Sequence, residues 1–129
     1  METAIERLAA VSFFVIGVSH IIQPRAWAQF FIEIREKGET GSFINAFIHF
    51  PLGALIVAFH PVWRGLPMVL TLIGYGLVIK SLIYFVFPGH GRRMLARVSL
   101  ERAWGFVVAG VFSVGISALL LFILIGKQD

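Results

Sequence analysis

The sequence contains no cysteine, and this absence removes several kinds of chemistry. A disulfide framework, a thiolate metal site and a CxxC redox pair are all excluded. Charge is also scarce, because charged residues make up 14% of the 129 residues whereas hydrophobic residues make up 58%. So few polar side chains do not cover a water-soluble protein of this size. We therefore expect this chain to reside in a lipid bilayer.

Motifs of soluble enzymes are missing too. The sequence holds no GxSxG, HExxH or P-loop pattern, and it shows no acid–base pair at a plausible pocket, so we do not expect an enzyme. It begins without a basic region or a small-residue cleavage site, which argues against a cleaved signal peptide. The net charge of +4 comes from arginines in short loops between apolar runs. Anionic lipid headgroups at the cytoplasmic face are therefore the expected partners, and nucleic acid is not.

Four apolar runs are long enough, or nearly so, to cross a bilayer, since a helix needs roughly 20 such residues. They are residues 3–22, 43–59, 66–87 and 103–126. The second contains Pro51, which predicts a kink and not a break, because neighbouring helices satisfy the freed carbonyl group. We predict an all-α membrane protein with a single domain of four transmembrane helices.

The segments between these runs differ in pattern. Residues 24–37 place four apolar side chains at helical spacing, which predicts an amphipathic helix in the membrane interface. Residues 38–42 (GETGS) predict a turn or flexible loop. After the third span, Pro88-Gly89-His90-Gly91 is followed by a basic stretch, residues 92–102, which predicts a second, shorter interfacial helix. The first and third loops hold seven basic residues against three on the other side, which predicts cytoplasmic loops, external termini and a bacterial inner-membrane location. The seven are Arg25, Arg35, Lys37, Arg92, Arg93, Arg97 and Arg102.

The two halves of the chain are alike in layout. In residues 3–60 and again in residues 66–126, a span ends in proline, an amphipathic segment follows, and a second span completes the half. Two spans in each half preserve the sense of insertion, so the pattern predicts a parallel internal repeat.

Small residues predict where the helices pack. Membrane helices associate through close backbone approach and interhelical hydrogen bonds more than through apolar burial. The fourth span carries a stripe of small residues at i, i+4 spacing, which predicts a packing face toward another helix of this chain or of another copy. The stripe consists of Gly105, Ala109, Ser113 and Ser117.

Five polar residues lie in the cytoplasmic third of the spans. They are predicted to converge on a pocket if the helices form one bundle: Lys80, Tyr84, His20, His49 and Asn45. An ionisable group inside a span is a functional-site hypothesis by default. Each residue also has a simpler interpretation. The lysine reaches the headgroups, the histidines bond neighbouring carbonyl groups, and the tyrosine belongs to the interfacial aromatic belt. His60 is predicted to lie too far away to join them.

These residues support functions of different classes. As a binding site, Lys80 with Asn45 and Tyr84 would hold an anionic lipid headgroup or a quinone carbonyl, with the histidines as donors. The chain would then be an accessory or scaffold subunit, or a lipid- or quinone-binding module, associated with other membrane subunits or with itself. Alternatively, His20 and His49 would ligate haem b in an anchor of a respiratory or photosynthetic complex. A small transporter is the third alternative.

The run GVSHIIQPRAWAQFF and the segment RRMLARVSLERAWG, each beside an apolar span, resemble the YjeT-like small bacterial inner-membrane proteins. The resemblance implies a tandem fusion of two such units in an inner membrane, and it carries no activity. The DoxX-like four-span proteins share the general plan, but no motif here is specific to them.

Overall fold

The computed structural model describes residues 1–128, and within them the chain forms six helices. The four long ones are α1 (Glu2–Ile22), α3 (Glu39–Phe59), α4 (Met68–Val86) and α6 (Trp104–Gly126), and each is long and apolar enough to cross a membrane. The two short ones are α2 (Pro24–Glu36) and α5 (Pro88–Leu95). The predicted all-α fold with four membrane-spanning helices is confirmed.

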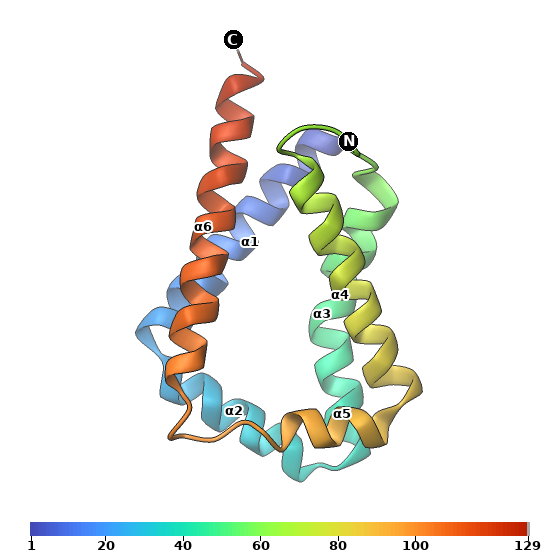
Figure 1. The fold of residues 1–129 in the computed structure, drawn as a ribbon, viewed down its shortest axis with the longest axis vertical. Coiled ribbons are helices and arrows are strands. Elements are labelled where there is room, and N and C mark those ends of the chain that lie inside the picture. Colours follow the sequence, from blue (N-terminus) through green and yellow to red (C-terminus); the bar gives the residue numbers. More distant parts are fainter. Residues whose placement is uncertain (129) are drawn as a thin grey trace.

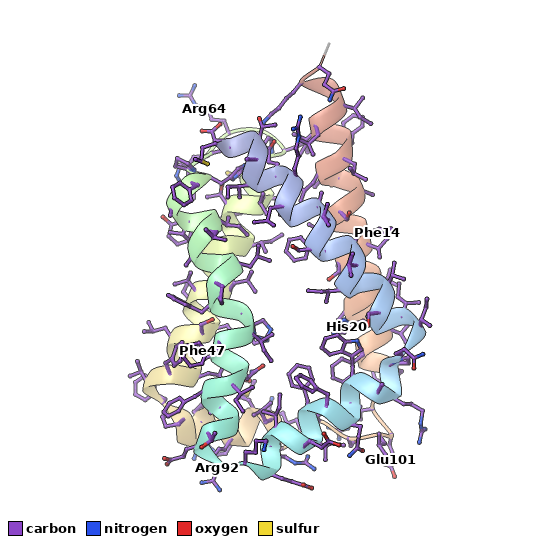
Figure 2. The ribbon with its side chains drawn as sticks, turned by 180° about the vertical axis from the view of Figure 1, so that it is seen from behind. Phe14, His20, Phe47, Arg64, Arg92 and Glu101 are labelled. Atoms are coloured by element: carbon purple, nitrogen blue, oxygen red, sulfur yellow. The ribbon has the colours of Figure 1, made fainter. Side chains whose placement is uncertain are left out.

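The long helices form two pairs and not one closed bundle (Figure 1). Helix α1 packs along α6, and α3 packs along α4. Both termini lie at one end of the molecule, where α1 meets α3, and α2 and α5 connect the two pairs at the opposite end. We call these the termini end and the α2/α5 end. In Figure 2 the termini end is marked by Arg64, and the α2/α5 end is marked by Arg92 and Glu101.

Each end of the molecule has its own apolar core. The core at the termini end joins all four spans, and its buried members are Ile5, Ala9, Ala10, Ile56, Leu70, Leu120 and Ile123. The core at the α2/α5 end joins the two short helices to α3 and α4, and its buried members are Ile34, Ala46, Tyr84 and Leu95. Many apolar side chains elsewhere on the spans are exposed, as expected where lipid covers them.

Two glycines let α1 and α6 approach closely. A Cβ atom added at Gly17 would lie 2.9 Å from the carbonyl oxygen of Gly110, and one added at Gly110 would lie 2.6 Å from that of Gly17. Neither position has room for a side chain. Further along the same contact, the Ser117 hydroxyl donates a 2.8 Å hydrogen bond to the carbonyl oxygen of Ala10. Small residues and a buried interhelical hydrogen bond thus join this pair.

The predicted stripe coincides with this contact only in part. Ser113 and Ser117 lie on it, since a Cβ atom at Gly17 would be 2.9 Å from Ser113 Cβ. Gly105 has open space around it, and Ala109 is exposed. Within the chain, the contact with α1 is therefore made by the C-terminal half of the stripe, and Gly110 occupies the closest approach. That Gly105 and Ala109 pack against another copy stays a prediction.

Helices α3 and α4 meet in the same manner. A Cβ atom at Gly53 would lie 2.8 Å from Leu77 Cβ and 3.2 Å from the carbonyl oxygen of Gly74. A Cβ atom at Gly74 would collide with the side chain of Ile56, which is fully buried. Helix α3 continues through Pro51 as one element.

The connections after the first and third spans share a backbone conformation. Gln23 has φ −123° and ψ 52°, Phe87 has φ −121° and ψ 67°, and a proline begins the next helix in both cases. Proline suits the first helical position because the amide hydrogen that it lacks would have no partner there. Two copies of one repeated unit would have the same conformation at this connection, as these two residues do. The repeat itself stays a prediction.

The loop predicted at residues 38–42 is wrong beyond Gly38. Residues 39–42 belong to the first turn of α3. Residues 88–91, for which no element was predicted, belong to α5, so His90 is helical. Tight packing explains the error at the start of α3, because Gly41 is buried against Ile34 and the Ser42 hydroxyl donates a 2.8 Å hydrogen bond to the carbonyl oxygen of Tyr84. The predicted interfacial helix at 92–102 is displaced, since α5 ends at Leu95.

Substituting Gly17 with leucine should lower the free energy of unfolding by about 2 kcal/mol or more, because the added side chain has no space. Thermal unfolding in detergent measures the change. Gly105→Leu is the matched control, since Gly105 faces open space on the same helix pair. Equal destabilisation by both variants would contradict the observed packing.

Candidate functional site

Lys80 and His49 form a polar contact between α4 and α3. Lys80 Nζ lies 3.3 Å from His49 Nε2, and His49 Nδ1 lies 2.8 Å from the carbonyl oxygen of Asn45. A carbonyl oxygen only accepts, so Nδ1 carries the proton and donates it. Nε2 is then the acceptor for the Lys80 ammonium group. The histidine therefore orients the lysine and does not neutralise it.

Asn45 and Tyr84 complete this group on the same helix pair. Asn45 is 2% exposed and Tyr84 is 7% exposed, and the two side chains are adjacent. Within residues 1–128, Asn45 Oδ1 has no hydrogen-bond partner. Buried polar atoms normally have one, so this oxygen is an acceptor that lacks a donor. We call these four residues, Lys80, His49, Asn45 and Tyr84, the Lys80 site.

Among residues 1–128, no acid compensates the charge of Lys80. In the described part of the chain both ion pairs involve Glu6, and neither includes Lys80. The Lys80 residue is exposed. A cation within a span is costly unless it reaches water, headgroups or an anion. The site thus contains a cationic group and, on the same helix pair, a buried acceptor without a partner.

His20 does not join the Lys80 site, which corrects the predicted convergence of five residues. It lies on α1, in the other helix pair, and Nδ1 donates a 2.7 Å hydrogen bond to the carbonyl oxygen of Ile16. Its ring stacks on Trp27 with a centroid distance of 4.2 Å and lies 5.6 Å from Phe106. Trp27 in turn donates a 2.8 Å hydrogen bond from Nε1 to Ser19 Oγ. Figure 2 shows His20 where α1 approaches α2.

The two histidines do not fit a haem site as they stand. Both use Nδ1 to bond a carbonyl oxygen of their own helix, which is the second-shell arrangement of many metal-bound histidines. Iron would then have to bind Nε2. However, Nε2 of His49 faces the Lys80 ammonium group at 3.3 Å, and a cation there opposes a metal ion.

A further polar cluster, which the sequence analysis missed, lies at the termini end. Glu6 is fully buried on α1, and its carboxylate receives hydrogen bonds from Lys127 Nζ at 2.7 and 2.8 Å. Its Oε1 also lies 3.1 Å from Nε2 of His60, which is fully buried at the end of α3. His60 Nδ1 lies 2.9 Å from Thr71 Oγ1 on α4. We call these four residues the Glu6 cluster.

The Glu6 cluster connects all four spans. Glu6 belongs to α1 and Thr71 to α4, while His60 and Lys127 directly follow α3 and α6. In the sequence analysis, the depth of each polar residue is measured along its own span, and by this measure His60 lies apart from the others. The measure ignores how the helices converge in space. The available signal was Glu6 itself, an acid inside an apolar run that needs a cationic partner when buried.

Arginines gather at the opposite end. Arg35, Arg92 and Arg93 line a hollow of about 390 Å³ between α2 and α5, together with Gly89 and Ala96. Arg35 also donates hydrogen bonds of 2.8 and 3.4 Å to the carbonyl oxygens of Val98 and Ala96. This basic hollow has the positive charge that attracts phosphate groups.

Comparisons with protein families, with curated proteins and with solved structures found no match to this chain.

Replacing Glu6 with leucine should lower the free energy of unfolding by about 3 kcal/mol, because His60 and Lys127 lose their common partner inside the protein. Thermal or denaturant unfolding in detergent measures this. Glu2→Gln is the control, as Glu2 is exposed on the same helix and should change stability by less than about 0.5 kcal/mol. A Glu6 variant as stable as the control would show that the cluster does not join the helices.

Proposed function

We propose that this chain is a non-catalytic membrane protein that binds an anionic phospholipid at the Lys80 site. The observation that carries the proposal is an exposed Lys80 residue without an acidic partner among residues 1–128. It lies on the same helix pair as the unpaired oxygen of buried Asn45. An anionic headgroup would compensate the charge. A glycerol hydroxyl of the lipid would donate to the asparagine oxygen.

The depth of the site suits a lipid whose phosphate lies at the membrane surface. Lys80 precedes the end of α4 at Val86 by six residues, which is about 9 Å along a helix. The four methylenes of a lysine side chain reach most of that distance. Tyr84 lies closer to the helix end, at the level where the ester and headgroup region is expected.

The basic hollow supports the same class of ligand. It lies at the α2/α5 end, toward which α4 runs from Lys80. We propose that this end faces the cytoplasm of a bacterial inner membrane, because the loops there carry most of the basic residues. Anionic lipid at that face would meet the arginines with its phosphate groups. An accessory or scaffold role beside other membrane subunits is consistent with the absence of catalytic motifs.

Lys80→Met should reduce retention of phosphatidylglycerol about fivefold relative to phosphatidylcholine, since one basic residue contributes about 1 kcal/mol to binding anionic lipid. Native mass spectrometry of protein released from nanodiscs of mixed composition gives the ratio. Lys80→Arg should keep the preference for anionic lipid because it keeps the charge.

Arg64→Gln is the control for loss of a positive charge away from the site, because Arg64 is exposed in the loop at the other end. An unchanged lipid ratio in Lys80→Met would contradict the proposal. If a quinone co-purifies with the parent protein and is absent from Lys80→Met, the ligand of the site is a quinone and not a lipid.

A further inference from the structure

The hydrogen bonds of the Glu6 cluster fix where its protons lie. Thr71 has one hydroxyl proton, and its Oγ1 lies 2.9 Å from the carbonyl oxygen of His60 and 2.8 Å from that of Val62. Carbonyl oxygens only accept, so the hydroxyl proton is directed to them. Thr71 Oγ1 must then accept from His60 Nδ1, which lies 2.9 Å away. Nδ1 of His60 therefore carries a proton.

The second nitrogen of His60 requires another proton. Nε2 lies 3.1 Å from Oε1 of Glu6, and both atoms are fully buried. If neither carried a proton, two lone pairs would face each other without water, which is unfavourable in a buried site. One proton must lie between them, either on the imidazolium ring or on the carboxyl group.

We propose that Glu6 and His60 form a buried proton-binding site that controls how the two helix pairs are joined. With the proton bound, a hydrogen bond connects α1 to the end of α3. Without it, the contact becomes repulsive, and the pairs separate at the termini end while α2 and α5 keep the other end connected.

No other titratable group competes for this proton among the described residues. The His60 ring faces Thr71 on α4 and Glu6 on α1, and the Glu6 carboxylate faces His60 and Lys127 of the segment after α6. Lys127 bonds both carboxylate oxygens and is 38% exposed. Lys127 thus holds the carboxylate through contacts that do not involve His60.

The sign of the effect follows from this arrangement. The joined state binds one proton more than the separated state, so rising pH favours separation. This proposal is independent of the lipid bound at the Lys80 site.

Distance measurements between spin labels test it directly. Because the chain has no cysteine, Arg64→Cys with Gly126→Cys introduces one label on each helix pair, at exposed positions of the termini end. In nanodiscs the distance distribution should be narrow at about pH 5.5 and should become longer or broader by about pH 9.

Glu6→Gln in the same background is the decisive variant. The glutamine amide group donates permanently to His60 Nε2, so the distribution should stay narrow at both pH values. Glu2→Gln should behave like the parent protein, since Glu2 is exposed. A parent protein whose distances do not change with pH would overturn the proposal, and so would a pH response that persists in Glu6→Gln.

Nitrogen NMR of histidine in the intact protein gives a second readout that does not depend on helix movement. The His60 resonances are assigned by their loss in His60→Gln. The chemical shift of Nδ1 should be that of a protonated nitrogen at every pH, and the chemical shift of Nε2 should change with pH. An unprotonated Nδ1 at acidic pH would overturn the proposal.

Discussion

Two close approaches between helix backbones determine this architecture. Gly17 meets Gly110 where α1 crosses α6, and Gly53 meets Gly74 where α3 crosses α4. In lipid, apolar side chains gain little by leaving one hydrocarbon environment for another, so backbone proximity and buried polar contacts decide which helices associate. The first span therefore pairs with the last, and the two middle spans pair with each other. The Glu6 cluster then joins the two pairs at one end, and α2 and α5 join them at the other.

Much of the fold could be predicted from the sequence because its causes are local. Apolar length predicts the four spans, and Pro24 with the spacing of Trp27 and Ile34 predicts α2. The errors arose where packing overrides local preference. The glycine-rich start of α3 is suited to a loop. Gly41 is nevertheless helical, because only a residue without a side chain fits against Ile34 at this position. Likewise, α6 meets α1 through Gly110 and not through Gly105, since helix crossing depends on both partners.

The sequence predicted the members of the candidate site correctly only where they lie on the same helix pair. Lys80, Tyr84, Asn45 and His49 lie on adjacent spans at similar depth, and the structure brings them together. His20 has the same depth but lies on the other pair, which depth alone does not reveal. The Glu6 cluster shows the converse case. Glu6 and His60 are 54 residues apart, and they meet only because α1 tilts toward the end of α3.

Cross-linking tests the central claim, the pairing of α1 with α6, most directly. The Ser117 hydroxyl lies 2.8 Å from the carbonyl oxygen of Ala10, and the protein has no cysteine of its own. Ala10→Cys with Ser117→Cys should therefore form an intramolecular disulfide in native membranes under mild oxidation, whereas Ala10→Cys with Gly105→Cys should not. Failure of the first pair to cross-link, with both cysteines reactive toward a small thiol reagent, would contradict this arrangement of the helices.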